Sequence, residues 1–216
     1  MKLIILYDNT IFKEKKGFKS DWGFSCLIET GNKNILFDTG ANPQILHNNM
    51  KILNVDPSSI DKIIISHEHW DHNGGLGLFK PFSKKVELFR ITEDTNNYFL
   101  KSNLIKDLQE IEPHIITTGR LTGFPVDEQT LIIERDEGIY VVVGCSHSGI
   151  ENIFRVAKKF DSIIGLIGGF HDFNNFQLLE ELKVICPTHC TTHKQKIKEM
   201  FPKSYTSGGV GKKISF

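Results

Sequence analysis

The sequence lacks the features that would tie it to a membrane or to a nucleic acid. No apolar run approaches the length of a membrane-spanning helix, and the apolar stretch near the start, residues 3–7, is too short for a secretory signal core. The 26 basic side chains are balanced by 26 acidic ones, so no net charge draws the chain to nucleic acid or to an anionic membrane. We therefore expect a cytoplasmic protein that binds a small-molecule substrate, with no nucleic-acid or membrane partner; its oligomeric state stays open.

A disulfide framework and low-complexity linkers are also absent. The four cysteines (26, 145, 186 and 190) are too few for the disulfide framework of a small secreted domain in a chain of 216 residues. Cys186 and Cys190 flank His189, but no fourth ligand for a structural zinc ion is evident there, which favours buried thiols. The apolar content of 39% supports a hydrophobic core, and the length fits a single domain over residues 1–216.

Hydrophobic patterning predicts strands that alternate with helices in both halves of the chain. The predicted strands are 2–7, 24–29, 34–37, 61–65, 86–90, 130–135, 139–143, 162–167, 183–186 and 211–216. The predicted helices are 43–53, 99–110, 149–159, 175–182 and 192–201. Two sheets packed face to face with helices outside would satisfy this pattern, which predicts an α/β fold class.

The densest group of metal-ligand residues is His67-Glu68-His69-Trp70-Asp71-His72, which directly follows the predicted strand 61–65. Imidazole suits zinc and other transition metals, and a carboxylate adds an oxygen ligand. If the backbone is extended, His67 and His69 lie on one face because alternate residues of a strand do. Asp71 and His72 then fall past the turn, where they can face a second ion. The segment therefore predicts a metal site.

Three further histidines, His147, His171 and His189, also lie where predicted strands end. An isolated histidine is more often a satisfied structural residue than a ligand. Three in the same setting, in a chain whose first motif needs partners, favour the ligand interpretation. The remaining histidines at 47, 114 and 193 lack this setting, and we interpret them as surface or structural residues.

These motifs resemble those of the metallo-β-lactamase-fold superfamily. Its His-x-His-x-Asp-His pattern is matched at residues 67–72, its upstream strand-and-turn motif at residues 36–40, and its later single histidines at His147 and His189. Segments 144–153, 168–171 and 186–191, with 127–129, are similar to a narrower branch labelled dihydropterin-ribofuranosylaminobenzene phosphate synthase-like. The resemblance implies an αββα sandwich of two mixed sheets with metals at one edge.

The resemblance also implies how the ligands divide. The implied first site is His67, His69 and His147, and the implied second site is Asp71, His72 and His189. Where the superfamily has a metal-bridging aspartate, this chain offers His171, with Asp172 beside it. His171 is then a further ligand or an acid–base group at the substrate, or Asp172 reaches the metals instead. Asp71 would orient the nucleophile while holding a metal, and Asp38 would accept a hydrogen bond from a ligand imidazole.

We expect a metal-dependent hydrolase that uses a metal-bound hydroxide on a phosphoester or a related small-molecule ester. Its cofactor would be one or two divalent ions, with zinc favoured over iron or manganese. One alternative is phosphate chemistry on a pterin or folate analogue, in which Phe170, Phe173 and Phe176 stack on a flat ring, although core packing explains them more simply. Another is a mononuclear iron redox enzyme on the same fold.

Overall fold

The computed structural model describes residues 1–13, 16–93 and 100–216, and the chain divides into two compact units. The first unit comprises residues 1–105 and 208–216, and the second comprises residues 106–207. The prediction of one domain over residues 1–216 stays a prediction. Among the described residues, none of the helices combines the length and the apolar character that a membrane span requires.

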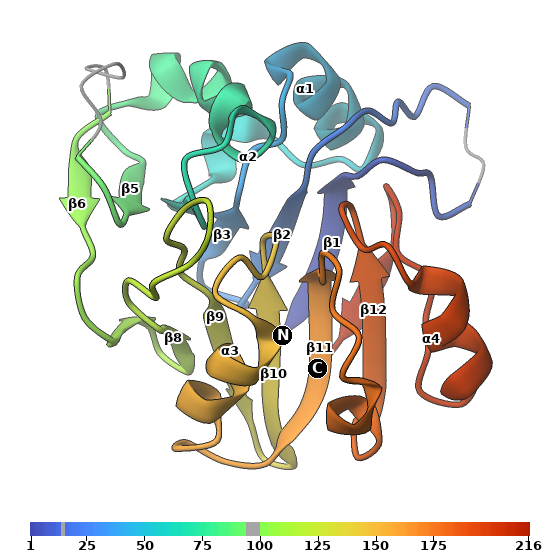
Figure 1. Ribbon diagram of the computed structural model, residues 1–216. Coiled ribbons are helices and arrows are strands. Elements are labelled where there is room, and N and C mark those ends of the chain that lie inside the picture. Colours follow the sequence, from blue (N-terminus) through green and yellow to red (C-terminus); the bar gives the residue numbers. More distant parts are fainter. Residues whose placement is uncertain (14–15, 94–99) are drawn as a thin grey trace. The chain divides into compact units, whose positions relative to one another are not determined.

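The first unit is built on a mixed seven-stranded sheet, counted over its described residues (Figure 1). In spatial order its strands are β13 (Lys213–Ser215), β1 (Lys2–Tyr7), β2 (Ser25–Glu29), β3 (Asn34–Phe37), β4 (Lys62–Ile64), β5 (Glu87–Arg90) and β6 (Ser102–Leu104). Strands β13 to β3 pair antiparallel, and β3 to β6 pair parallel. The carboxyl ends of the parallel strands therefore share one edge of this sheet.

Helix α1 (Pro43–Ile52) covers part of this sheet through an apolar stripe at helical spacing. Asn42 caps the helix by accepting hydrogen bonds from the backbone N–H groups of residues 44 and 45, and Pro43 fits the first helical turn. Leu46 and Met50 are buried in the core of the unit, together with apolar side chains of β1 to β4. The short helices η1 (Pro57–Ser59), α2 (Trp70–Asn73) and η2 (Gly74–Phe82) complete this unit.

The second unit is built on a mixed six-stranded sheet, again counted over its described residues. In spatial order its strands are β12 (Val184–Thr188), β11 (Ile163–Gly169), β10 (Gly138–Val143), β9 (Leu131–Arg135), β8 (Ile115–Thr117) and β7 (Gln109–Glu112). Strands β12, β11 and β10 run parallel, whereas β10 to β7 pair antiparallel. The predicted hairpin at residues 130–143 is confirmed by the antiparallel register of β9 and β10.

Two helices pack on this second sheet. Helix α3 (Ile150–Ala157) buries Ile150, Ile153, Phe154 and Ala157, whose spacing follows the helical period. Helix α4 (Lys194–Met200) contributes Ile197 to the same core. The predicted α/β fold class of two mixed sheets with helices is therefore confirmed.

Two predicted helices are wrong. The segment 99–110, of which residue 99 lies outside the described residues, contains strand β6 and the start of β7. Its apparent apolar stripe does not pack as one, because Leu104 and Leu108 are 38% and 41% exposed. The segment 175–182 holds only a short 3-10 helix, η3 (Phe176–Leu179), after which Lys183 already pairs with Ile164 of β11.

Candidate metal centre

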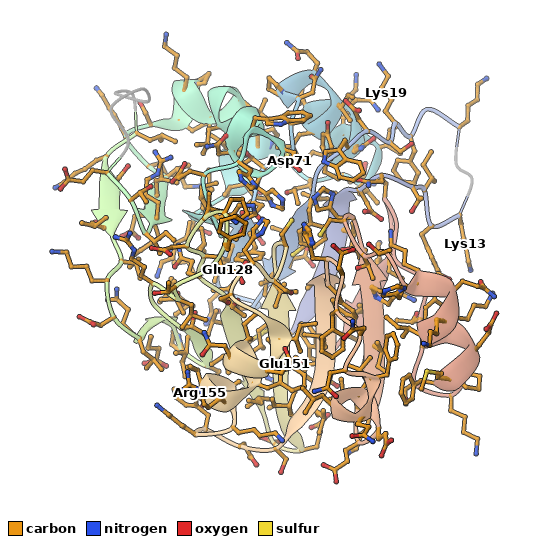
Figure 2. All side chains as sticks on the ribbon, viewed as in Figure 1. Lys13, Lys19, Asp71, Glu128, Glu151 and Arg155 are labelled. Carbon is orange, nitrogen blue, oxygen red and sulfur yellow. The ribbon has the colours of Figure 1, made fainter. Side chains whose placement is uncertain are left out.

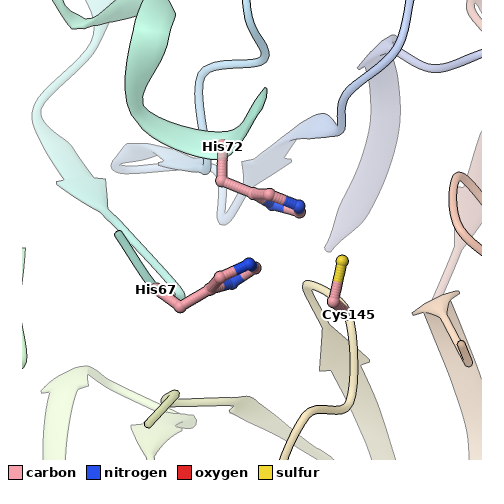
Figure 3. Close-up of side chains that lie close together, drawn as sticks. All are labelled: His67, His72 and Cys145. Atoms are coloured by element: carbon pink, nitrogen blue, oxygen red, sulfur yellow. The ribbon is translucent and has the colours of Figure 1, made fainter. Parts of the chain in front are cut away.

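The loop that follows β4 concentrates the metal-ligand side chains of the first unit. Buried Ile63, Ile64 and Ile65 hold the strand in the core, and the chain then turns into α2. His67 and His72 are fully buried, and their rings lie next to each other with centroids 4.1 Å apart (Figure 3). Asp71, labelled in Figure 2, lies in the first turn of α2. His67, Asp71 and His72 are thus buried in the protein, whereas Trp70 of the same loop is exposed.

Two glycines allow this loop to approach the turn after β3. The backbone N–H of Gly75 donates to the Gly40 carbonyl at 3.0 Å. A Cβ atom at Gly75 would lie 2.1 Å from the Thr39 carbonyl oxygen, and one at Gly74 would lie 2.3 Å from the Ala41 carbonyl oxygen. The close backbone approach therefore depends on glycine at both positions.

His67 and His69 direct ring nitrogens at the same point. Nε2 of His67 lies 3.0 Å from Nδ1 of His69, as expected for alternate residues of an extended segment. Zinc–nitrogen bonds of about 2.0–2.1 Å in a tetrahedron place two nitrogens roughly 3.3 Å apart. The pair therefore fits two ligands of one divalent cation after a shift of a few tenths of an ångström.

Asp38 fixes the proton positions on two of the imidazoles. Its buried carboxylate accepts hydrogen bonds from the Ser66 backbone N–H at 2.7 Å, from Ser66 Oγ at 2.8 Å and from His72 Nδ1 at 2.7 Å. Since the Ser66 hydroxyl donates its only proton to Asp38, the 2.9 Å contact with His67 requires that His67 Nδ1 donate to Ser66 Oγ. Both imidazoles, in this inferred tautomer, carry their lone pair on Nε2, the form that binds a metal.

Asp71 and His72 form a second pair of ligand-type side chains in this unit. Oδ2 of Asp71 lies 3.8 Å from Nε2 of His72, the ring nitrogen that carries the lone pair. Asp38 accepts the hydrogen bond that we expected from a ligand-type imidazole. That His72 binds a metal stays a prediction.

Glu68, the remaining acidic side chain of the loop, supports the loop instead. It accepts hydrogen bonds from Arg90 Nε at 2.8 Å, Thr92 Oγ1 at 3.0 Å and Asn73 Nδ2 at 2.8 Å, and it forms an ion pair with Arg90 Nη2. The Arg90 side chain, at the end of β5, is fully buried. We did not single out this pair from the sequence. An arginine at the end of a predicted strand was its only signal.

In the second unit, His147, His171 and His189 follow the carboxyl ends of β10, β11 and β12. Because these strands are parallel neighbours, the three histidines lie at one edge of the sheet. The rings of His147 and His171 have centroids 5.2 Å apart. His171 and His189 have positive φ angles of 47° and 43°, a conformation that non-glycine residues adopt rarely and that is enriched at functional sites.

Buried Glu128 positions the loop that carries His147. Its Oε1 atom accepts hydrogen bonds from the Ser148 backbone N–H at 2.9 Å and from Ser148 Oγ at 2.7 Å. Ser146 Oγ donates to the Gly169 carbonyl at 2.7 Å, which ties the same loop to β11. Both serine hydroxyls thus hold the loop in place.

His171 and Asp172 occupy different surroundings. The His171 side chain is 49% exposed, and its Nδ1 lies 3.4 Å from Asp172 Oδ2. Asp172 is more exposed and accepts a hydrogen bond from Thr192 Oγ1 at 2.6 Å, which, with the nearby His171, lowers the pKa of this carboxyl. The His171 ring lies beside the ring of His147.

A pocket of about 270 Å³ opens beside these histidines in the second unit. Its lining includes His147, His171, Phe124, Phe173 and Glu151, the last labelled in Figure 2. Phe124 is 88% exposed, whereas Phe170 and Phe176 are buried in the core of the unit. Core packing therefore explains two of the three phenylalanines that we considered for ring stacking, and Phe124 was missed.

Comparison with known proteins assigns the chain to a family. The metallo-beta-lactamase superfamily model matches residues 23–155. The uncharacterized protein MJ0448 of Methanocaldococcus jannaschii is 32% identical over 97% of this chain and 98% of its own length. The 7,8-dihydropterin-6-methyl-4-(beta-D-ribofuranosyl)-aminobenzene-5'-phosphate synthase of the same organism is 31% identical over 92% of this chain and 91% of its own length.

Solved structures agree with this assignment. Tm1679, described as a metal-dependent hydrolase of the beta-lactamase superfamily, has a TM-score of 0.79 and 25% identity over 100% of this chain and 99% of its own. A diphosphatase from the PhnP family shares the fold alone, with a TM-score of 0.68 and 14% identity over 100% of this chain and 97% of its own. The chain belongs to the metallo-beta-lactamase superfamily.

Proposed function

We propose that the chain is a metal-dependent hydrolase that cleaves a phosphoester or a related small-molecule ester. The observation that carries the proposal is the Asp38–Ser66 hydrogen-bond network, which sets the lone pairs of His67 and His72 on Nε2. Membership of the superfamily supports it, as does the similarity to a metal-dependent hydrolase. In this proposal His147 joins His67 and His69 on one ion, and His189 joins Asp71 and His72 on a second.

A divalent cation held by these residues, with zinc favoured, would lower the pKa of a water ligand toward neutrality and thereby supply a hydroxide nucleophile. Asp71 would help to hold the cation and would orient the nucleophile. Asp38 keeps the imidazoles in the ligand tautomer throughout. His171, half-exposed at the pocket, would bind the cation as a further ligand or exchange a proton with the substrate.

Metal content and hydrolysis together test this function. Protein purified without chelator should contain at least one equivalent of a divalent metal and hydrolyse bis(p-nitrophenyl) phosphate or a related ester. His67→Ala should lose activity and should contain less metal than the unaltered protein. His47→Ala, which changes an exposed histidine on α1, should keep both. Less than one equivalent of metal in the unaltered protein, with no activation by zinc, manganese or iron, would contradict the proposal.

A second candidate is phosphate chemistry on a pterin-like substrate. The similar methanogen protein is named as a synthase of a dihydropterin phosphate, and exposed Phe124 offers a face for ring stacking at the pocket. Titrating 6-hydroxymethylpterin should quench the fluorescence of the pterin, and Phe124→Ala should weaken the binding about 5- to 10-fold, since one aromatic contact is worth about 1 kcal/mol. Leu108→Ala removes another exposed apolar side chain of this unit and should change nothing. A flat titration would exclude this candidate.

A further inference from the structure

Two thiols and an imidazole meet at the carboxyl edge of the second sheet. Cys145 follows β10, and His189 and Cys190 follow β12. The ligand atoms of these three residues all lie within 4.8 Å of one another. Cys145 and His189 are buried, Cys190 is partly buried, and the Cys190 thiol lies 3.9 Å from the Cys145 carbonyl oxygen, to which it donates. All three residues belong to the second unit, so the group is complete within it.

Two glycines of the intervening strand leave the room for this group. Strand β11 runs between β10 and β12 and ends in Gly168 and Gly169. A Cβ atom at Gly169 would lie 2.7 Å from the Cys190 sulfur and 2.5 Å from the Gly144 carbonyl oxygen. A Cβ atom at Gly168 would lie 2.0 Å from the Val143 carbonyl oxygen. The absence of side chains at both positions brings the two thiol-bearing turns together.

The group differs from the one that the sequence suggested. In the sequence, Cys186 and Cys190 flank His189. In the structure, the residue that lies with His189 and Cys190 is Cys145, which is 45 positions from Cys190. Cys186 lies within β12 and is fully buried, paired in register with Ile167 of β11. It is therefore a natural control, a buried cysteine four residues from Cys190 that lies outside the group.

We propose that Cys145, His189 and Cys190 form a site for a thiophilic divalent cation such as Zn²⁺ or Cd²⁺. Two thiolates and one imidazole are the donors that such ions prefer, and three protein ligands leave one position of a tetrahedron for water. On binding, each thiol releases its proton to solvent and its sulfur bonds to the metal, so no oxidant is required. A cation held here would use His189, and so compete with the proposed second hydrolytic site. The thiol site itself does not rest on that function.

Cadmium alone is the probe that separates this site from the histidine ligands of the first unit. Only a sulfur–cadmium bond gives the intense ultraviolet charge-transfer absorption of a thiolate complex. Titrating Cd²⁺ into the reduced full-length protein should therefore produce this band. Cys145→Ser or Cys190→Ser should reduce its amplitude about twofold, and the double variant should abolish it. Cys186→Ser and His67→Ala should keep the band, even where His67→Ala abolishes hydrolysis.

A second measurement needs no variant and so does not depend on how the variants fold. In the ¹¹³Cd NMR spectrum of the unaltered protein, a thiolate-ligated ion should give a resonance well downfield of ions bound by nitrogen and oxygen alone. The proposal is overturned if that resonance and the charge-transfer band are absent, if the band persists in the double variant, or if Cys186→Ser removes it.

Discussion

Replacing Asp38 by asparagine should move protons on two of the histidines that we propose as metal ligands. The asparagine Oδ1 can still accept from the Ser66 backbone N–H, the 2.7 Å contact of the carboxylate. Its amide nitrogen, however, then presents a donor to Ser66 Oγ and to His72 Nδ1, which lie 2.8 and 2.7 Å from Oδ2 of Asp38. His72 Nδ1 must become an acceptor, and the Ser66 hydroxyl turns its proton toward His67 Nδ1. Each imidazole then carries hydrogen on Nε2, where the metal would bind.

The expected cost falls on metal affinity rather than on folding. Loss of a partner that orients a ligand typically lowers metal affinity 10- to 100-fold, or about 1.4–2.7 kcal/mol. The change in unfolding free energy should be smaller, about 1 kcal/mol, because the variant exchanges hydrogen bonds instead of leaving buried groups unpaired. The variant should therefore remain folded while holding zinc weakly.

Competition for zinc with a chromogenic chelator measures the affinity, and ¹⁵N NMR of the metal-free protein reports which ring nitrogen carries the proton. Asp56→Asn is the matched control in the same unit, since asparagine caps a helix as well as aspartate does and η1 should be kept. A folded Asp38→Asn protein with unchanged zinc affinity and unchanged histidine tautomers would refute the reasoning.

Three further changes test the supports of the site. Glu68→Ala should lower the unfolding free energy measured in urea by about 1.5–3 kcal/mol, because the buried Arg90 guanidinium loses this carboxylate partner; an effect below about 1 kcal/mol would contradict a stabilising ion pair. Gly75→Ala should lower the unfolding free energy by about 1–3 kcal/mol and weaken zinc binding, because its Cβ would meet the Thr39 carbonyl. Gly77→Ala is the control, since its Cβ would meet nothing within 4 Å, and it should change neither quantity in the same urea titrations. The hydrogen bond from Arg120 lowers the pKa of Asp127, so this pair stabilises the fold above the unfolded pKa, and that stability is lost as pH falls through the folded pKa. Arg120→Gln should therefore cost at most about 1 kcal/mol near pH 7, and the two proteins should converge in stability as the pH falls below the lowered pKa of Asp127; a gap that persists in acid would argue against the pair.

The strands that carry the site could be predicted because their patterns are local. The apolar run before His67 and the alternation that places His67 and His69 on one face need only neighbouring residues, and the structure reproduces both. The turn at Asp38 could also be predicted, because this residue directly follows a predicted strand.

The contacts that sequence reasoning missed join residues far apart in the chain. Arg90 reaches Glu68 only because β4 and β5 are paired, and Cys145 reaches Cys190 only across the end of β11. The helix that we predicted over 99–110 is an error of the opposite kind, in which a local pattern misleads. Its apolar residues have helical spacing, but the pairing of β6 with β5 as an edge strand overrides that preference. The pairing of β4 with β5 and the pairing of β5 with β6 leave no signal within a short window of sequence.

Anomalous X-ray diffraction at the zinc edge, on crystals of protein purified without chelator, tests the central claim most directly. The account predicts a cation bonded to Nε2 of His67, Nδ1 of His69 and His147. It allows a second ion at Asp71, His72 and His189, and the same maps would show whether His171 is a ligand. Fully metallated protein in which no anomalous peak contacts His67, His69 and His147 would contradict this prediction, whatever ions are found elsewhere.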